Sequence, residues 1–352
     1  RFGKTLTMTM LRDFLDIRQD SREIFSGLKI MNYPDVVRNY MNQYPVVFLS
    51  LKEVFGQDFD SVFLNLSIAM SKLFEENAFL IDSPNVSNVS KDFFRTIWRQ
   101  EGKQANTEQA LDLISSILKQ HYGKQAFIII DEYDVPMAKA LGTPYYDQVR
   151  DMIEHMLSYI CKTNDNVKGV ILSGCLYTVK NSTYTGVNNI IPYTVLSPIY
   201  ASSIGFTDED VKKLLDDAGL PDIYDTVEEW YDGYIFGNTE VFCPWDVANY
   251  LSAVLDNERA KPKNYWAGTS SNSILNDFVN HCKIDASEKF ETLLNGGTIT
   301  EEICEELTYD KLGASEKNLW SVLLMTGYVS KADKSISRGT VKLRIPNAEI
   351  AD

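Results

Sequence analysis

Two uninterrupted apolar runs constrain the fold of this chain more than any other feature. AFIII (126–130) and the GVIL within KGVILSGC (168–175) are strand-length, and continuous apolar runs are typical of parallel strands buried on both faces. An amphipathic helical segment, 107–123, stops at Gly123 before the first run, and a second one, 147–162, separates the two runs. Strands separated by helices require crossover connections, so the sequence predicts an α/β protein with a parallel sheet flanked by helices.

The same alternation extends towards the start of the chain. A short β-rich run lies at 44–50, and a helical pattern follows at 64–74. The stretch 82–106 is rich in Asn, Ser and Gln, and we expect an irregular insertion there. The alternation ends near residue 200, which predicts a first domain over residues 1–200.

Beyond residue 200 the sequence becomes mostly helical. Thr207 precedes a run of acidic residues, the arrangement of an N-cap followed by an acidic first turn, which predicts a helix within 205–220. Further helices are expected at 245–256, 271–283 and 300–325, and a strand at 341–347. We therefore predict a helical lid or winged-helix-like domain over 201–340, with 341–352 as the start of another domain.

Gly3, Lys4 and Thr5 match the end of a phosphate-binding loop, G-x-x-x-x-G-K-[ST]. In such a loop the glycine lets the backbone approach the phosphates, the Lys ammonium reaches the β- and γ-phosphates, and the hydroxyl ligates Mg²⁺. An amphipathic helical stretch follows directly, and the dipole of its amino end favours an anion. The motif is weak by itself, because Gly-Lys-Thr also occurs by chance.

Asp131 and Glu132 follow the apolar run 126–130, where carboxylates are hard to explain by packing. A strand-end Asp can hold hydrated Mg²⁺, and the Glu beside it can deprotonate an attacking water. The alternative is that Asp131 or Asp134 caps a helix. Ser173, at the end of the next run, is placed to hydrogen-bond a γ-phosphate or the water; the alternative is a serine that merely closes a strand.

Several strings together resemble the bacterial AAA-ATPase-like family: RFGKT, FIIIDEYD, LSGCLYTVKNSTYTGVNN, GFTDEDV, WYDGYIFG, VFCPWDVANYL and NYWAGTSSNSIL. The resemblance covers nearly the whole chain. It implies a P-loop NTPase core that is commonly followed by a PD-(D/E)XK-nuclease-like domain, and that domain would begin after Asp352. It also implies that RFGKT is a truncated phosphate loop and that the chain is a fragment.

The resemblance assigns roles to the residues that match its motifs. Gly3, Lys4 and Thr5 would hold phosphate, with Thr5 also on Mg²⁺. Asp131 would hold the metal, and Glu132 would act on the water.

Two further positions match the family in a segment after the second apolar run. Ser173 corresponds to the sensor position, and Lys180 to the Lys of an R-x-x-K segment, where it would contact the nucleotide. The usual Arg of that segment is Tyr177 here. If that Arg faces phosphate in the family, hydrolysis is slow in this protein, because removing a cation from a phosphoryl-transfer site costs several powers of ten in rate.

Composition excludes other classes of function. With 34 Lys and Arg against 49 Asp and Glu, the net charge of −15 opposes attraction to phosphate backbones, so we expect no direct nucleic-acid binding by this segment, although net charge does not exclude a local basic patch. The apolar runs are too short to cross a membrane. Scattered cysteines and the lack of a leader predict a cytoplasmic protein. The aromatic string 230–237 either stacks bases or, as we expect, packs the second domain onto the first.

These observations lead to one functional hypothesis and one alternative. The hypothesis is a nucleoside-triphosphate hydrolase that binds ATP and Mg²⁺, hydrolyses ATP slowly, and acts as a switch on a C-terminal nuclease-like domain in cis. Oligomerisation is compatible with the sequence. The alternative is a pseudo-ATPase, a nucleotide-binding interaction module that does not hydrolyse ATP.

Overall fold

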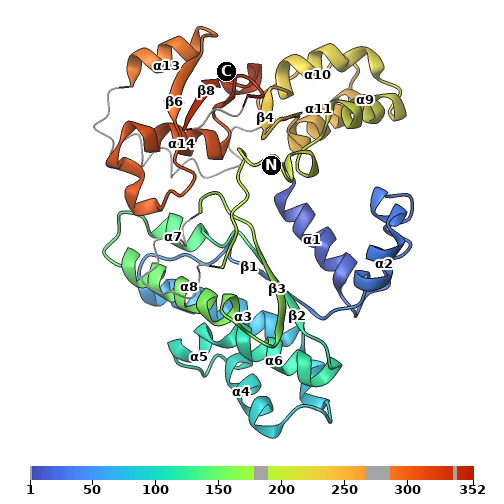
Figure 1. The fold of residues 1–352 in the computed structure, drawn as a ribbon, viewed down its shortest axis with the longest axis vertical. Coiled ribbons are helices and arrows are strands. Elements are labelled where there is room, and N and C mark those ends of the chain that lie inside the picture. Colours follow the sequence, from blue (N-terminus) through green and yellow to red (C-terminus); the bar gives the residue numbers. More distant parts are fainter. Residues whose placement is uncertain (1, 178–188, 266–285, 336–338) are drawn as a thin grey trace. The chain divides into compact units, whose positions relative to one another are not determined.

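The computed structural model describes residues 2–177, 189–265, 286–335 and 339–352 (Figure 1). The chain forms two compact units. We call Thr5–Ile190 the parallel-sheet unit, and Arg1–Lys4 together with Ile191–Asp352 the antiparallel unit. The boundary between them falls inside the Gly-Lys-Thr motif. Among the described residues, no helix combines the length and apolar character that crossing a bilayer requires.

The parallel-sheet unit is built on three strands in the order β1 (Val46–Ser50), β2 (Ala126–Asp131) and β3 (Val167–Leu172). Both pairings are parallel, as predicted, and the register places Ser50 opposite Asp131. The central strand β2 is almost completely buried, whereas β3 is only half-buried. The expectation of burial on both faces therefore holds for β2 and not for β3.

Helices cover both faces of this sheet. Side chains alternate along a strand, so Ile129 points into a cluster with Phe14 and Val46, and Ile128 points to the other face. On the first face lie α1 (Lys4–Leu15) and α2 (Pro34–Tyr40), and on the opposite face lie α3 (Phe59–Glu75), α6 (Ala110–Tyr122) and α8 (Tyr146–Cys161) (Figure 1). The α/β class predicted from the alternation is confirmed.

Two predicted helix ends are also confirmed. Helix α6 stops at Gly123, whose φ of 67° is the left-handed conformation that glycine adopts without steric cost. Helix α9 (Asp208–Asp217) begins with a capping box, in which the Thr207 hydroxyl accepts from the Asp210 backbone and the Asp210 carboxylate accepts from the Thr207 backbone.

The prediction of an irregular insertion at 82–106 is wrong. This stretch contains α4 (Asn88–Trp98) and α5 (Gln104–Glu108), after a 3-10 turn at Ala78–Asp82. The Ser87 hydroxyl caps α4 by accepting from the Ser90 backbone at 3.1 Å, and Phe94 and Ile97 are buried. The polar residues of the stretch concealed an amphipathic helix, because the apolar residues of α4 recur at helical spacing among Asn, Ser, Lys and Asp.

The antiparallel unit contains more strand than predicted. Its elements are α9, α10 (Tyr224–Tyr231), β4 (Tyr234–Phe236), β5 (Thr239–Val241), α11 (Pro244–Asp256), α13 (Ser287–Leu294), β6 (Ile299–Glu302), α14 (Glu316–Thr326), β7 (Ser330–Lys331), β8 (Thr340–Arg344) and α15 (Ala348–Ala351). Strands β4 and β5 form a hairpin, and β6, β8 and β7 form a second antiparallel sheet in that order. The predicted strand near the end of the chain is β8.

Two helix predictions in this unit have different outcomes. The single helix expected over 300–325 is wrong in its first half, where β6 and a helical turn at Tyr309–Ala314 lie, and right in its second half, where α14 lies. The helix expected at 271–283 lies outside the described residues. Tyr231 and Tyr234 of the aromatic string are fully buried in the core of the antiparallel unit, so their rings are not exposed for base stacking.

Candidate functional site

Three of the predicted site residues meet at the carboxyl edge of the parallel sheet. Asp131, the last residue of β2, is 2% exposed and accepts two hydroxyl hydrogen bonds. Thr5 donates from Oγ1 to Oδ2 over 2.7 Å, and Ser173 donates from Oγ to Oδ1. We call these three residues the hydroxyl–carboxylate cluster. It brings together a helix start and two strand ends that are far apart in the sequence.

The local structure explains why Ser173 reaches Asp131. The β2–β3 pairing continues past the end of β3, because the Ser173 backbone donates to the Ile130 carbonyl at 2.9 Å and its carbonyl accepts from Tyr133 at 3.0 Å. These bonds hold the two strand ends in register. Carboxyl ends of parallel strands meet at one sheet edge, so side chains that follow the two apolar runs become neighbours.

Glu132, the predicted base, lies at the turn that follows β2. Its φ is +54°, a left-handed conformation that costs a non-glycine residue about 1–2 kcal/mol. The chain turns here into α7 (Val135–Ala140), and Glu132 is half-buried. A non-glycine residue in this conformation is held by its surroundings, and such outliers gather at functional sites. The role of Glu132 as the base stays a prediction.

Sequence reasoning missed the roles of Tyr133 and Asp134. The Asp134 carboxylate accepts from the backbone amides of Cys175 and Leu176 at 2.8 and 2.9 Å. The Tyr133 hydroxyl donates to the Leu176 carbonyl at 2.6 Å. The DEYD turn after β2 therefore holds the loop after β3. One sequence signal could have indicated these contacts: polar residues follow both apolar runs, and the ends of parallel strands are neighbours.

These bonds also decide the alternative in which an aspartate caps a helix. Asp134 occupies the N-cap position of α7, but its side chain makes no capping hydrogen bond there and binds the loop after β3. Asp131 belongs to β2. Neither carboxylate acts as a helix cap.

Gly174 is required by the close approach of the two turns. A Cβ atom at this position would lie 2.7 Å from the Asp134 Oδ1 and 2.7 Å from the Tyr133 Cε1. Real Cβ contacts are longer, so any side chain here would push the loop away from the DEYD turn. The glycine thus sets the spacing next to Ser173.

The remaining predicted residues are placed as follows. Gly3 has a φ of +84° and lies just before α1, and Lys4 is the first residue of α1, so the Gly-Lys-Thr motif opens a helix. Lys180 lies outside the described residues. Tyr177, where the resemblance leads us to expect an Arg, is half-buried and donates its hydroxyl to the Ile190 carbonyl at 3.4 Å.

The donor set of the cluster suits Mg²⁺. Magnesium prefers oxygen ligands, and it keeps several waters while binding one or two carboxylates and the phosphates of a substrate. Asp131 and Thr5 supply such oxygens. Within the described parts of the chain, no group of three or more His, Cys, Asp and Glu side chains is arranged to hold a metal by itself. The two oxygen donors, Thr5 Oγ1 and the Asp131 carboxylate, fit a metal that would take its other ligands from waters and a phosphate.

The fold and this edge define an α/β protein with a polar site at the carboxyl ends of a parallel sheet, where such folds bind ligands. The model of a family described as "Predicted AAA-ATPase" matches residues 1–184, more than half of the chain. The chain belongs to this AAA-ATPase-like family, which confirms the resemblance found in the sequence.

One curated relative comes from Azotobacter chroococcum mcd 1 and is described as "Uncharacterized protein in vnfD 5'region". It is 24% identical to this chain over 232 residues, which is 65% of this chain and 42% of that protein. The matching region thus spans less than half of the relative's length. No solved structure matches the chain.

Proposed function

We propose that this protein is an Mg²⁺-dependent ATPase that acts as a nucleotide-dependent switch. The observation that carries the proposal is the 2.7 Å hydrogen bond between Thr5 and Asp131. It joins the hydroxyl that follows a Gly-Lys pair to the carboxylate that ends a buried strand. That pairing supports a shared magnesium and triphosphate site, and membership of a predicted ATPase family supports it independently.

Each residue has a distinct task in this proposal. Gly3 and the backbone amides at the start of α1 approach the phosphates, and the Lys4 ammonium offsets their charge. Thr5 and Asp131 hold the metal, which when bound neutralises charge on the phosphates. Lys180 is the second cation proposed for the nucleotide.

Hydrolysis requires a water to be placed and deprotonated. Glu132, beside Asp131 at the end of β2, orients the water and accepts its proton. Ser173 hydrogen-bonds the γ-phosphate or the water, and its present bond to Asp131 keeps the hydroxyl at the same edge. We propose slow turnover because Tyr177 stands where the family has an Arg. The switch acts on a nuclease-like domain in cis, a coupling that rests on the family resemblance.

A pseudo-ATPase is the second candidate, and the same tyrosine favours it. Binding needs the Lys4 ammonium, the amides and the metal ligands, none of which depends on the residue at 177. Loss of the Arg therefore reduces catalysis more than affinity. In this candidate, ATP serves only to clamp the structure.

The two candidates are separated by turnover and binding measured on the full-length protein. We expect Glu132→Gln to lower the rate of ATP hydrolysis by about 100-fold or more, because general-base catalysis contributes factors of that order. Binding of Mg²⁺-ATP, measured by calorimetry, should persist in this variant. Glu101→Gln, at an exposed glutamate outside the cluster, is the matched control and should leave turnover unchanged.

Other outcomes have clear meanings. Turnover that is equal in wild type and Glu132→Gln contradicts the assignment of the base. Stabilisation by Mg²⁺-ATP without any turnover supports the pseudo-ATPase. If Lys4→Ala binds Mg²⁺-ATP as tightly as wild type, the phosphate-loop assignment is wrong.

A further inference from the structure

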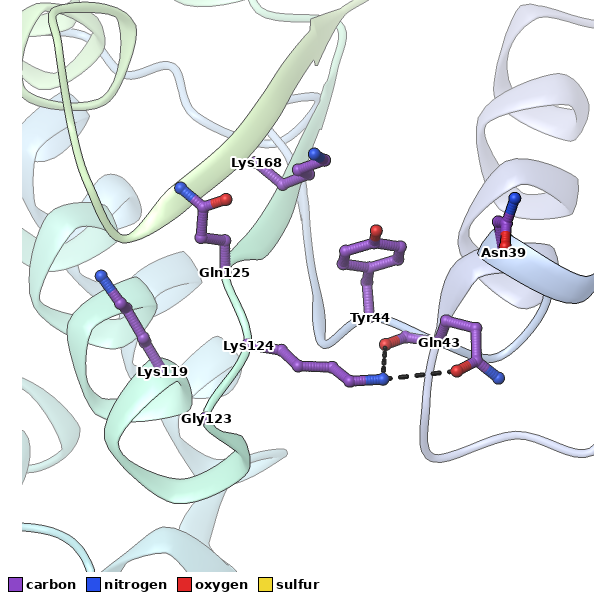
Figure 2. Close-up of a pocket in the computed structure, with 8 residues that line it drawn as sticks. All are labelled: Asn39, Gln43, Tyr44, Lys119, Gly123, Lys124, Gln125 and Lys168. Atoms are coloured by element: carbon purple, nitrogen blue, oxygen red, sulfur yellow. Dashed lines mark hydrogen bonds between the residues drawn. The ribbon is translucent and has the colours of Figure 1, made fainter. Parts of the chain in front are cut away.

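A second polar site lies at the opposite edge of the parallel sheet. A pocket of about 310 Å³ opens where β2 and β3 begin (Figure 2). Three lysines line it from three places in the chain: Lys119 in the last turn of α6, Lys124 just before β2, and Lys168 near the start of β3. We call it the lysine pocket. The proposed function makes no use of it.

The charge of this pocket is opposite to that of the whole protein. Its lining contains three lysines and no Asp or Glu, whereas the chain carries a net charge of −15. Amide side chains and the Tyr44 ring complete the lining. Asp165 lies two residues before β3. It accepts from the Lys119 ammonium through its backbone carbonyl, at 2.6 Å, and not through its carboxylate. Local positive charge gathered at a concave surface attracts anions.

The three ammonium groups retain donors for a ligand. Each ammonium has three protons. Lys124 donates to the Gln43 carbonyl at 2.9 Å and to the Gln43 Oε1 at 3.3 Å, with Tyr44 alongside, which leaves one proton (Figure 2). Lys119 donates once, to Asp165. The exposed Lys168 ammonium has no hydrogen-bond or ion-pair partner among the described residues.

The amide side chains add neutral groups next to the charge. Gln125 donates through Nε2 to the Asp165 and Val167 carbonyls at 3.2 and 3.3 Å, which orients the amide and leaves its oxygen on the other side (Figure 2). Asn39, from α2, lines the pocket across from the lysines (Figure 2). A ligand with both an anionic group and hydroxyls would find partners for each.

The lysine pocket is separate from the hydroxyl–carboxylate cluster. Both sites lie within the parallel-sheet unit, and β2 runs from Ala126, beside the pocket, to Asp131, in the cluster. Six residues in a strand extend about 16 Å. One small ligand therefore does not reach both sites.

We propose that the lysine pocket binds a small phosphate-bearing anion. Its volume lies at the lower end of the range for small-molecule sites, about 300–1,000 Å³. That size favours a compact ligand over a polymer strand, and the chain's net charge of −15 opposes a long polyanion. Phosphate oxygens are strong acceptors that match ammonium donors.

The test is lysine footprinting on the full chain with inorganic pyrophosphate as the probe. Lysines are acetylated briefly in magnesium-free buffer with and without pyrophosphate, and each residue is quantified by mass spectrometry. We expect pyrophosphate to slow acetylation of Lys119 and Lys168, and to leave the exposed Lys103, which does not line the pocket, unaffected. Equal rates with and without pyrophosphate at Lys168 would overturn the proposal.

Variants separate this site from the candidate nucleotide site. Lys168→Glu should weaken pyrophosphate protection of Lys119 by about tenfold or more, because a charge-assisted hydrogen bond is lost and a repulsion is added. Lys103→Glu, the same charge change outside the lining, should leave it intact. Lys4→Ala should also leave the protection of Lys119 intact. Pyrophosphate binding at the lysine pocket can therefore be observed even if the ATPase proposal fails. Protection of Lys119 that is lost in Lys4→Ala would overturn the proposal of a second site.

A final arm distinguishes a free anion from a nucleic-acid backbone. A single-stranded oligonucleotide of ten residues replaces pyrophosphate in the same footprint. Protection by pyrophosphate that exceeds protection by the oligonucleotide supports a small anion. Protection by the oligonucleotide alone overturns it in favour of a nucleic-acid surface.

Discussion

The two ends of the central strands differ in how completely their polar groups are satisfied. At the carboxyl edge, buried carboxylates accept from hydroxyls and from backbone amides, as Asp131 and Asp134 do. At the amino edge, three lysines line an open pocket, and the Lys168 ammonium has no hydrogen-bond or ion-pair partner among the described residues. A parallel sheet gives every strand the same direction, so residues before and after each apolar run are sorted to opposite edges. The comparison shows an acidic edge whose carboxylates are hydrogen-bonded and a basic edge that is open, on one scaffold.

The largest expected difference between the edges is in thiol reactivity. Cys161 ends α8, before β3, and burial raises its pKa to about 12; Cys175 is exposed in the loop after β3. Only the thiolate is alkylated, and a pKa of about 12 in place of the usual 8.5 reduces its fraction at pH 8 by about 1,000-fold. We expect iodoacetamide to modify Cys175 long before Cys161, as measured by peptide mass spectrometry.

The rate of thiol labelling should also change with pH and with bound ligand. Between pH 7 and pH 9 the rate at Cys161 should rise about tenfold per pH unit, because the thiolate fraction grows in that proportion well below the pKa. Mg²⁺-ATP should protect Cys175, whereas pyrophosphate in the lysine pocket should not. Similar rates for Cys161 and Cys175 at pH 8 would contradict the raised pKa of Cys161.

The next largest effect is expected from Gly174→Ala. The added methyl would meet Asp134 and Tyr133 at 2.7 Å, so the loop must move and strain its hydrogen bonds. We expect a loss of about 2–3 kcal/mol in the free energy of unfolding, from urea denaturation. Gly142→Ala is the control: its φ is +76° and nothing lies within 4 Å, so only the backbone cost of about 1 kcal/mol applies. A loss for Gly174→Ala below that of the control would show that the carboxyl edge is not tightly packed.

The smallest effect is expected at the amino edge, from Lys124→Met. This change removes the two hydrogen bonds to Gln43 but keeps most of the apolar stem. Because the group is half-exposed, we expect a loss of about 1 kcal/mol in the same denaturation experiment. Lys119→Met, which removes a single exposed bond to Asp165, should cost less. A loss for Lys124→Met above that of Gly174→Ala would reverse the comparison of the two edges.

Some of this arrangement followed directly from the sequence. Continuous apolar runs separated by helical patterns predicted the parallel sheet, and the polar residues after those runs singled out Asp131 and Ser173, which the structure places in contact. The Gly-Lys-Thr motif at a helix start predicted the place of Thr5. These inferences succeeded because each depends on a local pattern and on the direction of parallel strands.

Other features had no local signature. The bonds of Asp134 end on backbone amides, which look alike at every residue, so no sequence pattern indicates them. The left-handed φ of Glu132 occurs between Ile130 and Tyr133, which both hydrogen-bond Ser173, and no sequence pattern indicates it. The lysine pocket combines residues from three separate elements, and only the folded chain brings Lys119 and Lys168 together. Helix α4 was missed because the polar composition of the whole stretch 82–106 was read as a loop signal.

The hydrogen bonds between the turn after β2 and the loop after β3 restrict how this sequence can diverge. Tyr133 and Asp134 hydrogen-bond main-chain atoms of residues 175 and 176, so the identity of those two side chains matters little to these hydrogen bonds. The number of residues matters greatly, since one insertion between Ser173 and Leu176 would shift both amides out of reach. Homologous chains should therefore vary in the residue types at positions 175 and 176 while keeping the same number of residues between Ser173 and Leu176.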